Sequence, residues 1–278
     1  MRLLDRMEFK LPERPEFSNK GTFGKVLNIA GSENYSGAGY LSSVSALKIG
    51  CGYVALASSP KSMNTVACLS PDIVYIPLEN IKASLDKFNV VSIGCGLSVN
   101  AGTSILFKSL ISALSATDKT VLIDADGLNI MAKKKPSKLP EKLIITPHPM
   151  EASRLLKTDI EKILAKPVDY AQKLSKKYSC TTVLKLHSTV VCSKELDIYI
   201  NETGNSALSK AGAGDVLTGM ISGLVAQGLS EFEAAKLGVY LHGRTGEIAS
   251  SMLTEYSVLA SDLLKYIPLA IVDTLANQ

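Results

Sequence analysis

The residues most suited to chemistry are a run of small residues ending in an acid, Ala211-Gly212-Ala213-Gly214-Asp215, which an apolar helical pattern follows directly. A helix that begins in such a loop directs unpaired N–H groups and the positive end of its dipole at one point. We therefore expect the N–H groups of Gly212, Ala213 and Gly214 to bind an anion such as a phosphate. Asp215 would then reach the group that carries the phosphate. The alternative is a glycine-rich turn followed by an ordinary first-turn aspartate.

Two further glycine-rich segments favour a cleft in which a ligand approaches the backbone closely. The first is Ser36-Gly37-Ala38-Gly39, for which tight packing of a helix start against a strand is an equal alternative. The second is Gly94-Cys95-Gly96, which begins like a dinucleotide fingerprint. That fingerprint needs a third glycine where this chain has Val99, so a Rossmann oxidoreductase is rejected.

Acids and one histidine follow two of the predicted strands. Asp124 and Asp126 could hold Mg²⁺ through water, because Mg²⁺ takes few protein ligands and keeps its hydration. The alternative, which we favour for Asp126, is that it caps the next helix. His148 lies between two prolines and is stiffly placed, which suits a hydrogen bond to a substrate. Glu151 falls in a first helical turn and is predicted to be structural.

A second group of candidates lies in the carboxyl half of the chain. Lys185 ends a predicted strand, where it could contact a nucleotide phosphate as a point charge or simply be exposed. His187 is predicted to border a nucleotide pocket, and His242, on a helical pattern, to pack in the core. The sequence has no GxxxxGK[ST] motif and no protein-kinase motif set, so the loop before Asp215 is the candidate phosphate cradle.

Short apolar runs alternate with helical patterns, which predicts a mainly parallel central sheet with helices on both faces. We expect one α/β domain over 1–278, with ligands beyond the carboxyl ends of the strands. The expected strands are 26–30, 53–57, 72–76, 89–93, 120–123, 143–146, 182–186, 190–192 and 197–200, the last three forming tight turns or a hairpin. The expected helices are 38–49, 101–114, 150–156, 167–177, 215–227, 231–251 and 257–267.

Composition narrows the class of protein. The 278 residues carry a net charge of only +4 and no tryptophan, which argues against a nucleic-acid partner. Five cysteines, an odd number without CxxC spacing, favour a reducing compartment over a disulfide framework or zinc site. The amino terminus lacks an apolar core of signal-peptide length, and no apolar run is long enough to span a bilayer. These features predict a cytoplasmic protein without a membrane partner.

Taken together, the motifs resemble one family, the ADP/ATP-dependent NAD(P)H-hydrate dehydratases of the ribokinase-like superfamily. The matching segments stand in the family's order and cover about residues 20 to 250. They are Lys20-Gly21-Thr22-Phe23-Gly24-Lys25, Tyr35-Ser36-Gly37-Ala38-Gly39, Gly94-Cys95-Gly96-Leu97, Asp124-Ala125-Asp126-Gly127-Leu128-Asn129, Thr146-Pro147-His148-Pro149-Met150-Glu151 and Ala211-Gly212-Ala213-Gly214-Asp215-Val216-Leu217.

The resemblance implies a metabolite-repair lyase. It would phosphorylate the ring hydroxyl of the S-epimer of hydrated NADH or NADPH, using ADP or ATP with Mg²⁺, and then lose phosphate to restore the coenzyme. Asp215 would be the catalytic base. The positions that correspond to contacts with the hydrated dinucleotide are Ala38, Gly96, His148 and Asp215. Those that correspond to contacts with the adenine nucleotide are Lys185, Leu186, His187, Ser188, Thr189 and Gly214.

The family also suggests a homo-oligomer, a tetramer, and an epimerase that is either fused or separate. Two departures affect the expected site: Ala213 replaces a residue with a hydroxyl, and Leu186 replaces a glycine after Lys185. Two alternatives remain open at this stage. One is a ribokinase-type kinase of a small vitamin-precursor alcohol, against which the His-Pro-Met-Glu and Tyr-Ser-Gly-Ala-Gly segments argue. The other is a non-catalytic nucleotide-binding relative, against which Asp215 argues.

Overall fold

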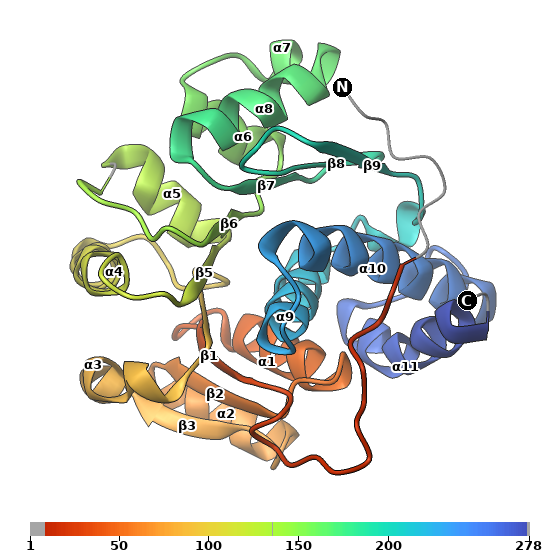
Figure 1. Ribbon diagram of the computed structural model, residues 1–278, viewed down its shortest axis with the longest axis horizontal. Coiled ribbons are helices and arrows are strands. Elements are labelled where there is room, and N and C mark those ends of the chain that lie inside the picture. The colour runs from red at the N-terminus through yellow and green to blue at the C-terminus, as the bar shows by residue number, and fades with distance from the viewer. Residues whose placement is uncertain (1–8, 135, 277–278) are drawn as a thin grey trace.

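A single nine-stranded sheet runs through the molecule in the order β3-β2-β1-β4-β5-β6-β7-β8-β9 (Figure 1). The computed structural model describes residues 9–134 and 136–276. Strands β1 to β7 are parallel to their neighbours, and β7, β8 and β9 are joined antiparallel. The strands are β1 Lys25–Ile29, β2 Tyr53–Ser58, β3 Val74–Pro77, β4 Val90–Ile93, β5 Thr120–Ile123, β6 Leu143–Ile145, β7 Thr181–Leu184, β8 Thr189–Cys192 and β9 Ile198–Asn201.

Helices cover both faces of the sheet, as the strand–helix alternation predicts. The first layer consists of α1 Ser36–Lys48, α2 Pro60–Leu69, α9 Ala213–Ala226, α10 Glu231–Leu253 and α11 Ala260–Ala276. The second consists of α3 Ile81–Ser84, α4 Ala101–Leu114, α5 Ala125–Lys133, α6 Pro149–Leu156, α7 Ile160–Ala165 and α8 Pro167–Tyr178. Three short 3₁₀ turns, Leu78–Asn80, Leu85–Lys87 and Ser206–Leu208, complete the helical segments. Among the helices described, none is both long and apolar enough to cross a membrane.

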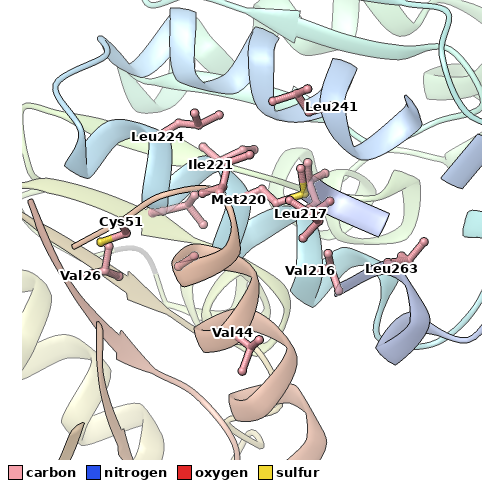
Figure 2. Packing of buried hydrophobic residues seen from close by; sticks show 14 of the residues in the cluster. Val26, Val44, Cys51, Val216, Leu217, Met220, Ile221, Leu224, Leu241 and Leu263 are labelled. Carbon is pink, nitrogen blue, oxygen red and sulfur yellow. The ribbon is translucent and has the colours of Figure 1, made fainter. Parts of the chain in front are cut away.

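Two separate hydrophobic cores lie on the two faces because side chains alternate along each strand. In β1, Val26 points into the core under α1 and α9, whereas Leu27 and Ile29 point into the core under α4 and α5. Both cores are densely apolar since both faces of each central strand are covered. Figure 2 shows part of the first core, to which Met220 and Ile221 of α9, Val44 of α1 and Leu241 of α10 all belong.

Helices α1 and α9 approach unusually closely at Gly219. A β-carbon built on Gly219 would lie 2.0 Å from Ser45 Oγ and 2.1 Å from the Ser42 carbonyl oxygen. Only glycine allows this separation. The contact fixes the direction of α9, and therefore the position of the loop that precedes it.

β2 and β3 lie on one side of β1 in the sheet, and β4 and the later strands lie on the other side. The gap between β1 and β4 is therefore the topological switch point, where open α/β sheets bind ligands. The two loops that leave this point are bonded to each other, because Gly31 N donates to Cys95 O at 2.7 Å. Gly96 has a φ of +59°, and a β-carbon there would lie 2.7 Å from the Ala38 β-carbon. The glycine segments after β1 and β4 thus pack tightly against each other. Tight packing is therefore at least one role of the 36–39 segment.

Sequence and structure agree on every strand to within two residues at each end, and the hairpin is confirmed. Helices α2, α3, α5 and α7 are not among the helices expected from the sequence. Helices α3 and α7 have only four and six residues, too few for a periodic pattern. Helix α5 was obscured by Gly127, a residue required because a β-carbon there would lie 2.8 Å from Ile93 O.

Replacing Gly219 with alanine should destabilise the protein by about 3 kcal/mol, because the added methyl group must push α1 away from α9. Urea unfolding measures the change. Gly102→Ala, in the first turn of α4, is the matched control: its β-carbon meets only Asn100 Oδ1, at 3.4 Å, so stability should be kept or slightly raised. Equal losses in the two variants would contradict this account of the α1–α9 contact.

Candidate active site

The loop before α9 is shaped by Gly212, whose φ is +94°. A side chain does not fit at this position, because a β-carbon on Gly212 would lie 2.6 Å from Leu41 Cδ1 and 2.9 Å from Ala260 Cβ. The expected anion site changes in one respect: the Ala213 N–H donates to Lys210 O at 3.2 Å and is not free. Within the described chain, no backbone carbonyl accepts from the nitrogens of Gly212 and Gly214. These two N–H groups remain the donors for an anion.

Asp215 lies in the first turn of α9, next to this loop. Burial raises the pKa of its carboxyl group to about 6, and the negative charge of Asp124 acts in the same direction. A hydrogen bond with the Cys95 thiol and the charge of Lys185 act to lower it. A carboxylate with a pKa of about 6 is ionised at neutral pH and is a stronger base than an exposed aspartate. It is therefore suited to accepting a proton.

Asp124 is the buried centre of the site, with 1% of its surface exposed. Its Oδ1 accepts from Lys185 Nζ at 2.7 Å, and its Oδ2 accepts from Thr218 Oγ1 at 2.7 Å. Burial favours the neutral acid, but the charge and hydrogen bonds of Lys185 outweigh it and hold the pKa of Asp124 below its ordinary value. For Lys185, desolvation acts to lower the pKa, and Asp124 and Glu151 overcome it and raise the pKa. The pair is thus fully ionised.

Two residues in this cluster escaped the sequence analysis as site residues. Thr218 lies one helical turn after Asp215, so the spacing alone places both on one face of α9. The Cys95 thiol donates towards Asp124 Oδ2 at 3.9 Å and is buried. Burial, followed by the charges of Asp215 and Asp124, raises the pKa of this thiol well above its ordinary value. No sequence signal marks Cys95 beyond its place between two glycines.

A cavity of about 730 Å³ opens beside the loop. Of the residues predicted to contact the adenine nucleotide, Lys185, Leu186, His187, Thr189 and Gly214 line it, and Ser188 does not. His187 thus borders a cavity, and its contact with a nucleotide there stays a prediction. The Thr189 hydroxyl closes the turn between β7 and β8, donating to Leu186 O at 3.1 Å. A cavity of about 790 Å³ lies at the amino ends of the central strands, around Lys119 and Glu231, away from this cluster at their carboxyl ends.

His242 also lines the 730 Å³ cavity, in addition to being buried in α10 as predicted. Burial lowers the pKa of its imidazole to about 4, so the ring is neutral. Its Nε2 has no hydrogen-bond partner among the described residues. The prediction of a packed histidine is correct, but the residue also faces the cavity.

His148 lies at the rim of the same cavity as the N-cap of α6. Its Nδ1 accepts from Met150 N at 3.2 Å, and Glu151 Oε2 accepts from His148 N at 2.9 Å, a reciprocal capping box. Nε2 lies 3.3 Å from Glu151 Oε1. Nδ1 is thus engaged within α6, whereas Nε2 is on a side chain that is 47% exposed and lies beside Glu151. The predicted contact of His148 with a substrate stays a prediction. The structural role predicted for Glu151 is confirmed, and burial raises its pKa to about 7.

Asp126 does not cap a helix, which corrects the expectation. Its Oδ2 accepts from Ser98 N at 2.8 Å and joins the loop after β4 to α5. Ala38 and Gly96, the remaining predicted substrate contacts, lie together at the switch point, outside the lining of the 730 Å³ cavity. Asp215 links the two regions: Gly214 beside it lines the cavity, and Cys95, at the switch point, acts to lower the pKa of its carboxyl group.

The donor set fits a magnesium ion that arrives with a nucleotide rather than one held by the protein alone. No group of three or more His, Cys, Asp or Glu side chains in residues 9–134 and 136–276 could hold a metal. Both oxygens of Asp124 already accept from Lys185 and Thr218. Mg²⁺ commonly keeps several waters and binds through phosphates and one carboxylate, which is compatible with this arrangement.

Comparison with known proteins gives the family. Residues 26–269 match the family described as NAD(P)H-hydrate dehydratase. The chain belongs to this family. It is 36% identical over 256 residues to the ADP-dependent (S)-NAD(P)H-hydrate dehydratase of Neisseria meningitidis, covering 90% of this chain and 84% of that protein. It is 34% identical to a bifunctional NAD(P)H-hydrate repair enzyme of Moorella thermoacetica, but spans only 51% of that protein's length.

The solved structures agree with the fold expected from the sequence. An ADP/ATP-dependent NAD(P)H-hydrate dehydratase from Bacillus subtilis, co-crystallised with ATP and Mg²⁺, superposes with a TM-score of 0.86 at 29% identity, over 95% of this chain and 94% of that one. A ribokinase-like protein from Enterococcus faecalis superposes with a TM-score of 0.87 at 26% identity, over 95% and 92%. The ribokinase-like α/β fold is confirmed.

Replacing Lys185 with methionine should destabilise the protein by about 3 kcal/mol or more at neutral pH, because Asp124 is left buried without its counter-charge. The loss should shrink in acid, where protonation of Asp124 removes the buried charge. Lys162→Met is the matched control: its ion pair with Asp159 is 2.8 Å long but 64% and 66% exposed, and its loss should be undetectable. Urea unfolding of both variants provides the measurement. Similar losses of stability in Lys185→Met and Lys162→Met would show that burial does not make the Asp124–Lys185 pair more important than an exposed pair.

Proposed function

We propose that this chain is a nucleotide-dependent (S)-NAD(P)H-hydrate dehydratase, a lyase that restores NADH or NADPH from the hydrated coenzyme. The observation that carries the proposal is the position of Asp215 between the Gly212–Gly214 donors and the Asp124–Lys185 pair, with its pKa raised to about 6. The family to which the chain belongs, and the relatives that carry this activity in their names, support the same conclusion.

In the proposed reaction, Asp215 accepts the proton of the ring hydroxyl, and the freed oxygen attacks the terminal phosphorus of the nucleotide. The N–H groups of Gly212 and Gly214 stabilise negative charge on the transferred phosphoryl group. Loss of phosphate and of a ring proton then restores the carbon–carbon double bond. Lys185 and the 185–189 turn hold the adenine nucleotide in the 730 Å³ cavity, while Ala38, Gly96 and His148 border the hydrated ring.

The proposed phosphoryl donor is ADP or ATP with Mg²⁺, which neutralises phosphate charge when bound. Asp124 is the protein group placed to contact the ion through water. Residues 1–278 are proposed to form a single domain that acts as a cytoplasmic homo-oligomer, a tetramer by analogy with the family. The bifunctional relatives, of which this chain spans about half, suggest that the partner reaction is carried out by an epimerase, fused or separate.

Asp215→Asn should abolish return of the reduced-nicotinamide absorbance from hydrated NADH with Mg²⁺ and ADP or ATP, since the amide cannot accept the hydroxyl proton. We expect a decrease of at least about a thousandfold in kcat, with nucleotide binding retained in a calorimetric titration. Turnover at the wild-type rate in this variant would remove Asp215 from the role of base. Accumulation of a stable phosphorylated product by the wild-type protein would instead indicate a kinase of a small alcohol, and binding without turnover a non-catalytic relative.

The pH profile of kcat/KM tests the same role. Because Asp215 must be ionised to accept a proton, kcat/KM should rise with pH to a plateau, with its midpoint near pH 6. Cys95→Ala should move this midpoint to higher pH, because the Cys95 thiol hydrogen bond lowers the pKa of Asp215. Measurement over pH 5 to 9 in both proteins decides the question. A flat profile in the wild type, or a midpoint that Cys95→Ala shifts downward, would be inconsistent with the assignment.

A further inference from the structure

Another cavity, of about 650 Å³, lies between α5 and α6 and is basic. We call it the α5–α6 groove. It is lined by Val99, Asn129, Ala132, Lys133, Arg154 and Lys157. Half of these residues are cations and none is an acid. In the part of the chain that the structure describes, none of the three cations forms a salt bridge.

The cations are held in place around the groove. Arg154 donates from one guanidinium nitrogen to Asn129 Oδ1 at 2.7 Å, which fixes the side chain across the gap between α6 and α5. The other N–H groups of the fork stay available for an anion. Lys157 is the C-cap of α6, with a φ of +53°, and Lys133 ends α5.

The groove adjoins the proposed substrate site on two sides. Arg154 is on α6, about 9 Å along the helix axis from its N-cap His148. Its positive charge is among the causes that lower the pKa of His148 and of Glu151. Val99 belongs to the loop that carries Gly96, and Ser98 N ties this loop to α5 through Asp126 at 2.8 Å.

The hydrated dinucleotide has phosphates that the active site described above does not accommodate. The 730 Å³ cavity is assigned to the phosphoryl donor, so the substrate must extend elsewhere from its nicotinamide ring. A further cavity, of about 700 Å³, lies beside the loop before α9 and is lined by Tyr40, Leu41 and Leu259 among others. It is mainly apolar, and its one cation, Lys210, already donates to Tyr256 O. Of these two cavities, the α5–α6 groove is therefore the better candidate for binding a phosphate.

We propose that the α5–α6 groove binds a phosphate of the hydrated dinucleotide substrate, with Arg154, Lys133 and Lys157 as its cations. This inference rests on the proposed function, because it takes the hydrated dinucleotide as the substrate. Two phosphate groups have this chemistry: the pyrophosphate, common to both coenzymes, and the 2′-phosphate of the NADPH form alone. Arg154 can hold either one with two parallel N–H bonds.

Kinetics with both hydrated coenzymes test the proposal. Arg154→Met should raise KM for the hydrated substrate about tenfold, with kcat and the KM for ADP or ATP unchanged. Lys133→Met and Lys157→Met should give smaller increases, and Arg154→Lys should recover part of the loss. An equal increase for hydrated NADH and hydrated NADPH identifies the pyrophosphate, and an increase for hydrated NADPH alone identifies the 2′-phosphate. Lys210→Met is the matched control and should leave both KM values unchanged.

Two results would overturn the proposal: unchanged KM in all three groove variants, or an increase in Lys210→Met in their place. Failure of the proposed function is distinguishable, because it would appear as absence of turnover in the wild-type protein. In that case calorimetric titration with NADP⁺ and NAD⁺, which carry the same phosphates, still tests the groove. Weaker binding in Arg154→Met than in the wild type would support it, and equal binding would contradict it.

Discussion

The buried ion pair between Asp124 and Lys185 is the interaction on which the site depends. It joins the end of β5 to the end of β7, and Thr218 extends it to α9, so three separate elements meet at one carboxylate. A buried pair of this kind is costly to form, because both ions lose their hydration. Its value here is positional. Burial and then the negative charge of Asp124 raise the pKa of Asp215, while Lys185 limits that rise, so Asp215 is ionised at neutral pH.

The packing of the helices supplies the second constraint. Because Gly219 lets α9 rest against the backbone of α1, the amino end of α9 has little freedom to move relative to the sheet. The Gly212 loop is pressed between Leu41 of α1 and Ala260 of α11. Anion-binding N–H groups are effective only when they already point at the place where charge develops. The dense first core is therefore part of the chemistry as well as of stability.

Much of this arrangement could be read from the sequence. Parallel strands were recognisable because each is apolar on both faces, and the rule that ligands bind beyond their carboxyl ends brought the loops of Ala38, Gly96, Asp124 and His148 to one rim. Side-chain partners could not be read in the same way. Asp126 binds a loop amide instead of capping a helix, and His148 Nδ1 caps α6 by accepting from Met150 N. Such choices depend on distances between segments that lie far apart in the chain.

The position of Cys95 has a consequence for resistance to chemical damage. The thiolate is the form of cysteine that peroxides and alkylating agents attack. Burial between two carboxylates keeps this sulfur protonated and out of contact with solvent. Cys51, Cys180 and Cys192 are buried as well, which leaves Cys68 as the exposed member of the five. An enzyme that repairs a damaged coenzyme would thereby keep its own active site intact under oxidising conditions that modify surface thiols.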